Sequence, residues 1–348
     1  MPILMRDVAM KAGVSITTVS HVLNQTRPVA EKTRQRVLKA AAGLDYFKNT
    51  SARLLVRGQS DLLGLIISDI ENPFFPELIK SFEGASSAQR MEVLLCATNY
   101  EAGQAQNAVR RMLENRVQGV AVMTSQFDER LAAQLTRKNV PIVLLSSTSS
   151  GRNRSSILID YRKGISDAAS HLFNLGHRVI SVAAGPRNQV SAVQHVQAVV
   201  QALGAHRLRP LRVLEGDHRP ESGAWAAKAF LSARRRPTAI FCANDRMAIG
   251  AIGAAEDLGF RVPEDLSIVG TDDVWMARYC HPPLTTVRIP RDRLGHLAFD
   301  LLMKMVRSQK TGLKEILETE LVERRSTGPV SRQARPFEKL TLTTGGHA

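Results

Sequence analysis

The stretch DVAMKAGVSITTVSHVLN, residues 7–24, predicts two short helices joined by a tight turn. In the first helix, Val8 and Ala12 lie one turn apart and can face a common core. Gly13 can adopt the positive φ that ends such a helix, and Ser15 can cap the helix that follows. This order of elements is typical of a helix-turn-helix.

The second helix has one apolar face, which carries Val19, Val22 and Leu23. Its other face is available to a partner and carries Ile16, Thr17, Ser20 and His21. In a helix-turn-helix, the second helix is the one that enters the major groove of DNA.

A third helix is expected over residues 31–44, burying Val37, Leu38 and Ala41. Its solvent side has four basic residues suited to phosphates, Lys32, Arg34, Arg36 and Lys39. Up to residue 60 the chain has ten Lys and Arg against three Asp and Glu, a surplus of seven within a net charge of +15. A helical bundle whose polar residues only face water would not need this concentration of charge, whereas binding to a polyanion would.

Several motifs in this region resemble the headpiece of the lactose/galactose/purine repressor family, the LacI family. They are Asp7-Val8-Ala9, Ala12-Gly13-Val14-Ser15, Thr18-Val19-Ser20, Val22-Leu23-Asn24, Lys32-Thr33-Arg34 and Leu44-Asp45-Tyr46. Asn49, Ala52 and Leu55 resemble the hinge helix of that family, and residues 62–328 resemble its effector-binding core. The resemblance therefore covers almost the whole chain except the last twenty residues.

The remaining sequence agrees with an α/β fold. From Leu62–Ile67 to Ile142–Leu145, short apolar runs alternate with helical segments, and a second series runs from Ile157–Ile159 to Leu266–Val269. Such βαβ series form parallel sheets covered on both faces, so two doubly wound lobes are expected. Late strands near 286–289 and 320–324, with a helix over 294–306, are expected to cross between the lobes, as in periplasmic-binding-protein-like folds.

The expected domains are a helix-turn-helix headpiece, a hinge, a core and a tail. They span residues 1–47, 48–59, 60–328 and 329–348. Within the core, lobe 1 is expected over about 60–160 plus 290–318, and lobe 2 over about 161–289 plus 319–328. The tail is polar and lacks the leucine heptads of a tetramerising coiled coil, so a dimer with a flexible tail is expected.

For the DNA contacts, the resemblance implies three sets of residues. Base edges are met by Ile16, Thr17 and His21. Phosphates and the headpiece itself are held by Ser15, Thr18, Ser20, Asn24, Thr33 and Arg34. At the hinge, Leu55 is expected to wedge into the minor groove, with Asn49 and Ala52 beside it.

In a pair of lobes of this kind, ligands lie beyond the carboxyl ends of the strands. Asn and Asp in those loops can hydrogen-bond a small polar molecule, although capping of the following helix explains each of them singly as well. The resemblance implies that Phe74, Asn244 and Asp272 contact an effector. A sugar or related carbohydrate is the expected class.

Three other cleft positions depart from the family pattern. His195 stands where the family usually has an Arg, His218 where an aromatic residue is frequent, and Ser146 where an Arg or Asp often stands. One interpretation is an altered pocket for a less acidic or pH-sensitive ligand, because histidine titrates near neutrality. The alternative is a decayed pocket, in a regulator that acts constitutively or through a protein partner.

Other functions are disfavoured. The chain has no Gly-x-Ser-x-Gly elbow, phosphate-binding Gly-rich loop or His-Glu-x-x-His motif, so an enzyme is not expected. Metal binding by His171 and His177 is conceivable, but capping of a helix end explains His177 better. Cys96, Cys242 and Cys280 are too widely spaced for a zinc site and fit reduced thiols. We expect no cofactor.

The expected partners are double-stranded operator DNA, a small-molecule effector and a second copy of the chain, without a membrane. The first residues lack a signal-peptide pattern and no apolar run approaches about 18 residues, which favours a cytoplasmic, nucleoid-associated regulator over a periplasmic binding protein. The run Arg234-Arg235-Arg236 is better explained as exposed surface than as a second nucleic-acid site.

Overall fold

The computed structural model describes residues 3–24, 26–46, 60–124, 127–146, 151–308 and 310–331. The chain divides into two units, one up to Ser60 and one from Asp61 onward. Each unit has its own hydrophobic core.

The first unit contains three helices, α1 (Met5–Ala12), α2 (Ile16–Asn24) and α3 (Glu31–Ala42). Fully buried valines join them, one from each helix: Val8, Val19 and Val37. The three helices are those that the sequence predicts, and together they form the small core that a helix-turn-helix needs to hold α2.

One residue of α3 lies differently from its prediction. Leu38 is 43% exposed, and Ala40 is buried instead. Ala40 and Ala41 lie three and four residues after Val37 and so share its face, whereas Leu38 is turned away by about 100°. The helix also ends at Ala42 rather than near Leu44.

The second unit begins with lobe 1, which is built on a six-stranded sheet of order β11-β5-β4-β3-β1-β2. Every neighbouring pair is parallel. The strands are β1 (Leu62–Ile67), β2 (Glu92–Ala97), β3 (Val120–Met123), β4 (Ile142–Leu145), β5 (Arg154–Asp160) and β11 (Lys314–Glu318).

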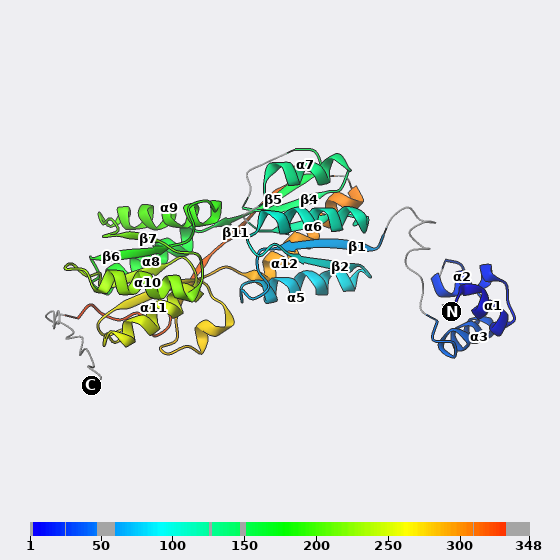
Figure 1. Ribbon diagram of the computed structural model, residues 1–348, viewed down its shortest axis with the longest axis horizontal. Coiled ribbons are helices and arrows are strands. Elements are labelled where there is room, and N and C mark those ends of the chain that lie inside the picture. The colour runs from blue at the N-terminus through cyan, green and yellow to red at the C-terminus, as the bar shows by residue number, and fades with distance from the viewer. Residues whose placement is uncertain are drawn as a thin grey trace, which may run out of the picture. The chain divides into compact units, whose positions relative to one another are not determined.

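Helices cover both faces of this sheet (Figure 1). On one face lie α5 (Phe75–Ala88) and α12 (Arg291–Ser308), and on the other α6 (Ala102–Glu114) and α7 (Glu129–Arg137). Successive side chains of a strand point to opposite faces, so Leu65 packs in the cluster of α5 and α12 while Ile66 packs in that of α6 and α7. This double burial explains why β1 is a continuous apolar run.

Lobe 2 repeats the design with a sheet of order β12-β10-β9-β8-β6-β7. Only the β10–β12 pair is antiparallel among its pairs. The strands are β6 (Ile180–Ala184), β7 (Val213–Glu215), β8 (Ala239–Cys242), β9 (Ser267–Asp272), β10 (Thr285–Arg288) and β12 (Glu320–Val322).

Lobe 2 also has helices on both faces of its sheet. One face is covered by α8 (Arg162–Asn174) and α9 (Val190–Ala205), the other by α10 (Pro220–Leu231) and α11 (Asp245–Asp257). A short 3-10 helix, η1 (Trp275–Arg278), follows β9.

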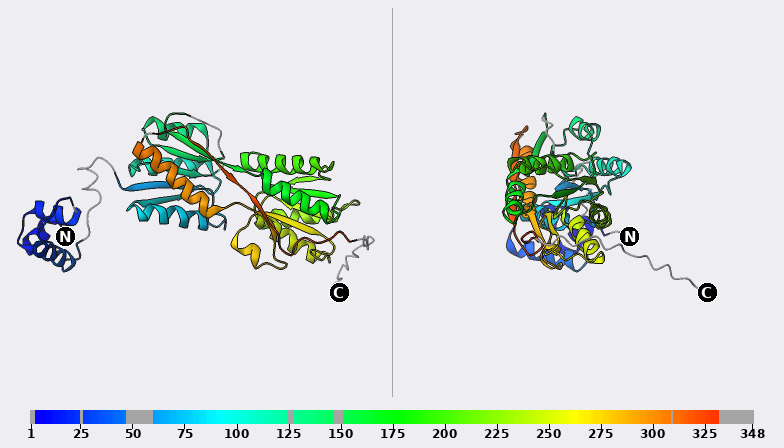
Figure 2. Two further views of the ribbon diagram at one scale, coloured as in Figure 1. Left: turned by 180° about the vertical axis from the view of Figure 1, so that it is seen from behind. Right: turned by 90° about the vertical axis from the view of Figure 1, so that its left-hand side faces the viewer.

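The chain passes between the lobes three times, from β5 to α8, from β10 to α12 and from β11 to β12. The view from behind in Figure 2 shows the last of these passages as a strand that runs from one lobe into the other. The passages that the sequence predicts near 286–289 and 320–324 are therefore present. Two doubly wound lobes, the expected fold class, are confirmed.

Two strands differ from the sequence interpretation. Residues 157–159 do not begin the second series but belong to β5, in the sheet of lobe 1. The sequence pattern also did not predict β11. Three of its five residues are exposed and only Leu317 is fully buried, which is typical of an edge strand and gives no apolar run.

Two further observations concern the described part of the chain. None of its helices is both long and apolar enough to cross a membrane. Cys96 and Cys242 are buried and Cys280 is half-buried, and all three are free thiols.

Candidate functional sites: a DNA-reading helix and a cleft between two lobes

The turn of the helix-turn-helix is formed as its residues predict. Gly13 ends α1 with a φ of 63°, a conformation that favours glycine. Ser15 Oγ accepts a hydrogen bond of 3.1 Å from the backbone N–H of Thr18, and thus caps the start of α2. The two hydroxyls of Ser15 and Thr18 also lie 2.9 Å apart.

The predicted base-reading residues lie on the accessible side of α2. Ile16 is 53% exposed and Thr17 is also exposed. His21 is half-buried, and its Nδ1 lies 2.7 Å from Thr26 Oγ1. This contact restrains the imidazole ring.

The residues predicted to hold phosphates are partly engaged within the headpiece. Arg34 is exposed and forms an ion pair of 3.4 Å with Glu31, one turn earlier on α3. Thr33 and Ser20 are half-buried. The side chain of Asn24 and the three hinge residues Asn49, Ala52 and Leu55 lie outside the described residues.

In the second unit, all six predicted effector residues line one cavity of about 100 Å³. They are Phe74, Ser146, His195, His218, Asn244 and Asp272. The first two come from lobe 1 and the other four from lobe 2, at the carboxyl ends of strands or on the helices that follow. The cavity therefore lies between the lobes, as the strand-end argument predicts.

Backbone hydrogen bonds fix the positions of Phe74 and Asn244. The backbone N–H of Phe74 donates to Asn72 Oδ1 at 3.1 Å, and its ring meets Phe75 edge to face. Asn244 Oδ1 accepts from the N–H of Met247 at 2.9 Å and so caps α11, while its Nδ2 donates to the carbonyl of His218. For Asn244, helix capping and a place in the cleft thus occur together.

His195 is buried, at 2% exposure. Its ring meets the ring of Tyr161 edge to face, with the centroids 5.8 Å apart, and its Nε2 lies 2.9 Å from Thr271 Oγ1. Burial, with a smaller effect of nearby His218, lowers the pKa of His195 to about 4. The imidazole is therefore neutral at pH 7.

His218 lies close to Gly185, where a Cβ would come within 2.3 Å of its Cε1. Only glycine leaves room for the ring there. His218 Nε2 lies 3.1 Å from Gln189 Oε1, and burial lowers its pKa to about 4. Because burial lowers the pKa of both histidines, the structure gives no support to the interpretation of a pocket that is pH-sensitive near pH 7.

Asp272 lies at the end of β9 with a φ of 112°, and Asp273 follows with a φ of 56°. Arg291, at the start of α12, donates to the backbone carbonyls of both residues. Arg291 also pairs with Glu77 of α5 at 2.5 Å. A guanidinium of lobe 1 therefore holds the unusual backbone of the lobe 2 loop that presents Asp272 to the cavity.

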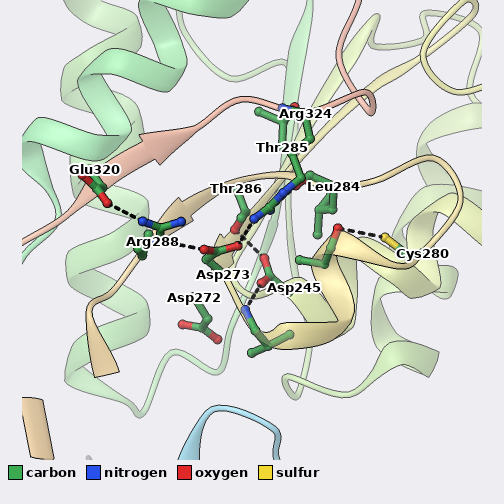
Figure 3. Close-up of polar contacts among 12 residues, drawn as sticks. Asp245, Asp272, Asp273, Cys280, Leu284, Thr285, Thr286, Arg288, Glu320 and Arg324 are labelled. Carbon is green, nitrogen blue, oxygen red and sulfur yellow. Dashed lines mark hydrogen bonds and ion pairs between the residues drawn. The ribbon is translucent and has the colours of Figure 1, made fainter. Parts of the chain in front are cut away.

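The two neighbouring carboxylates point in different directions, as Figure 3 shows. Asp273 pairs with Arg288 at 2.7 Å and Arg324 at 2.5 Å; Arg288 ends β10 and Arg324 follows β12. The Asp272 carboxyl points away from both arginines. Burial and the nearby Asp245 carboxylate raise the pKa of Asp272 well above its usual value.

Sequence reasoning missed several cavity residues. Tyr100, Tyr161 and Gln189 line the cavity, as do Ser68 and Asn72. Tyr100 and Tyr161 follow β2 and β5, so the strand-end rule that found Ser146 would have found them too. Gln189 directly precedes α9 and has no comparable signal.

The histidines considered for a metal have other partners. His177 contacts Thr238 Oγ1 through Nδ1 and the carbonyl of Gly328 through Nε2. Within the described residues, no group of three or more His, Cys, Asp or Glu side chains could hold a metal ion.

A helix-turn-helix joined in one chain to a two-lobed ligand-binding core defines a ligand-responsive DNA-binding regulator. A family model described as bacterial regulatory proteins of the lacI family matches residues 4–49, and one described as a periplasmic binding protein-like domain matches residues 169–327. The HTH-type transcriptional repressor PurR of Edwardsiella ictaluri is 36% identical over 333 residues, which cover 92% of this chain and 96% of that protein. The PurR repressor of Proteus mirabilis is 36% identical over 326 residues, with the same shares.

Solved structures agree. The lac repressor dimer bound to operator and the anti-inducer ONPF has a TM-score of 0.85 at 31% identity, covering 94% of this chain and 100% of that one. The complex of the transcriptional regulator CelR with cellobiose has a TM-score of 0.71 at 28% identity, covering 93% and 99%. The chain belongs to the LacI family and is a DNA-binding transcriptional repressor rather than an enzyme, which confirms both expectations.

Proposed function

We propose that this repressor binds a palindromic operator as a dimer, and that a small polar metabolite, a sugar or related carbohydrate, controls this binding from the cleft. The observation that carries the proposal is the cavity between the lobes, where six side chains selected from the sequence converge from both sides. A ligand that touches both lobes binds their open and closed arrangements with different affinity. It can thereby bias the arrangement of lobes, with a coupling of roughly 1–3 kcal/mol.

The size of the cavity indicates a closed arrangement. Its volume of about 100 Å³ would hold roughly three water molecules, whereas pockets for small ligands usually exceed about 300 Å³. A sugar therefore enters only when the lobes move apart. The small volume is also the observation that favours the alternative, a repressor whose cleft has lost its ligand.

A dimer is supported by an exposed aromatic surface on lobe 2. Trp275 is 62% exposed and Tyr279 is 79% exposed, and their ring centroids lie 6.3 Å apart. Large aromatic side chains exposed together are typical of protein interfaces. A two-fold dimer presents two equal headpieces, and this symmetry requires an operator of two inverted half-sites.

DNA selection tests the operator. The full-length protein should enrich, from a random pool, a site with two inverted half-sites, and sedimentation should give a dimer that Tyr279→Ser weakens. Enrichment of a single half-site by a monomer would refute the dimeric arrangement.

A ligand screen tests the effector. Thermal unfolding in the presence of sugars at about 10 mM should identify a compound that raises the melting temperature, because ligand binding to the folded state stabilises it. The same compound should change operator affinity. A compound that stabilises the protein but leaves operator affinity unchanged would contradict control by the cleft.

A further inference from the structure

The hydrogen bonds of His195 determine which of its nitrogens carries the proton. Thr271 Oγ1 lies 3.2 Å from the carbonyl oxygen of Cys242 and donates its single proton there. At 2.9 Å from His195 Nε2, the same hydroxyl oxygen must therefore accept, and Nε2 must be protonated. In the neutral ring Nδ1 is then left as an acceptor, and this atom is buried without a hydrogen-bond partner.

His218 is fixed in the same tautomer by a different neighbour. Its Nε2 lies 3.1 Å from Gln189 Oε1, an amide oxygen that can only accept. Nε2 therefore carries the proton, and Nδ1 is again a buried acceptor without a partner. Thr271 of β9 thus holds one imidazole ring, and Gln189, the residue before α9, holds the other. In both rings Nδ1 is left without a hydrogen bond.

Ser146 adds a third polar atom of this kind. Its Oγ is buried without a partner, on a residue with a φ of 55° directly after β4. Among the described residues, five buried side-chain polar atoms have no hydrogen-bond partner, and three of them belong to residues that line this cavity. Leaving such atoms unsatisfied is costly, so a ligand that supplies donors to them is favoured.

The lining of the cavity also lacks a cation. Its described residues include no Lys or Arg, and both of its histidines are neutral. Two guanidinium groups that act on cavity residues are paired with carboxylates, that of Arg246 with Asp69 and that of Arg291 with Glu77. A phosphate or carboxylate in the cavity would lose its hydration and meet no charged donor in return.

We propose that His195 and His218 are specificity-determining residues, and that they restrict the cleft to an uncharged, hydroxyl-rich ligand that donates hydrogen bonds to their Nδ1 atoms. This inference rests on the proposed effector site. The ligand must have several hydroxyl donors and must lack an anionic group.

Matched pairs of ligands test the charge selectivity. Binding to the full-length protein is measured by calorimetry for monosaccharides and their phosphate monoesters, polyols and the corresponding carboxylates, and nucleosides and nucleoside monophosphates. We expect binding only among the uncharged members, with at least about tenfold discrimination within the best pair, which corresponds to one unsatisfied buried group. Equal or tighter binding of an anionic member overturns the inference but leaves the effector site intact. If no member of any pair binds, the proposed effector site fails as well.

Two isosteric substitutions then test the assigned atoms with the best ligand. An Asn side chain can place a carbonyl oxygen near the position of Nδ1, whereas a Gln side chain reaches the position of Nε2. His195→Asn should therefore keep more ligand affinity than His195→Gln, which keeps the contact with Thr271 but loses the acceptor. Equal losses in both variants would show that Nδ1 is not the contact. Melting temperatures without ligand show whether each variant is folded.

His195→Arg supplies the cation that the cleft lacks. Its affinity for a phosphate monoester relative to the uncharged partner should rise by about tenfold or more, since hydrogen bonds to charged groups are the stronger ones. An unchanged preference in a folded His195→Arg protein would contradict the role of this position in charge selection.

Discussion

Arg246 of α11 and Asp69 in the loop after β1 form an ion pair of 3.4 Å that joins lobe 2 to lobe 1. Both side chains are less than a fifth exposed, at 17% and 18%, so solvent screens the pair only partly. The charges of both residues also affect the pKa of the hydroxyl of Tyr100, which lines the cavity. The pair therefore lies beside the cavity and holds the two lobes together.

Loss of this pair should shift the lobes toward the open arrangement. We expect Asp69→Asn to enlarge the radius of gyration of the ligand-free protein in small-angle scattering, because about 1 kcal/mol of closing free energy is removed. Asp167→Asn is a matched control, since its pair with Lys163 is exposed and lies within α8. Identical scattering from both variants would contradict a closing role for Asp69.

The stability of the protein should fall in acid partly through His195. Its pKa is about 4 in the folded state against an ordinary value of 6.5, so the unfolded chain binds the proton more readily. The contribution is complete above about pH 6.5 and is lost as the pH falls toward 4, to a total of roughly 3 kcal/mol. Denaturant unfolding of His195→Asn should therefore show a weaker loss over this range than the unsubstituted chain. His281→Asn, at an exposed histidine, serves as the control and should not flatten the pH profile.

Substitutions of a base-contacting residue and of a phosphate-contacting residue should change DNA binding in different ways. We expect Thr17→Ala to cost about 1–3 kcal/mol of operator affinity and to relax the preference at one base pair in each half-site. Arg34→Ala should instead weaken binding to all sequences alike and lower the salt dependence by about one phosphate contact. Fluorescence anisotropy over a salt series with operator and scrambled duplexes measures both effects. An equal loss of affinity for operator and scrambled duplexes in Thr17→Ala would mean that Thr17 contacts the DNA backbone and not a base.

Leu55 lies outside the described residues, and its role remains the prediction drawn from the family resemblance. If Leu55 inserts into the minor groove, Leu55→Ser should weaken operator binding by a few kcal/mol and reduce DNA bending, because the polar side chain cannot stabilise an unstacked step. Ligand binding to the core should be unaffected. Unchanged operator affinity in gel-shift titrations would exclude the wedge.

Much of the cleft could be predicted because parallel strands end at one edge of a sheet. Phe74, Ser146 and His218 follow three different strands and Asp272 ends a fourth, and the strand-end rule alone brings them together without any knowledge of contacts. The apolar runs that identify those strands are strong signals because both faces of each sheet are buried.

Contacts between side chains of different lobes could not be predicted in the same way. Arg291 begins α12 in lobe 1 yet holds the backbone of Asp272 and Asp273 in lobe 2, and nothing in the local sequence indicates this reach. The neutrality of His195 is a second example. Its pKa depends on burial beside residues far away in the sequence, such as Tyr161 and Thr271.

The three passages of chain between the lobes limit how the lobes can move. Because all three connect the same two lobes, the simplest remaining motion is a rotation about one axis. In such a motion only the angle between the lobes changes, whichever molecule binds in the cleft. Different side chains in the cleft, such as His195 and His218, can therefore select different ligands while the motion between the lobes stays the same.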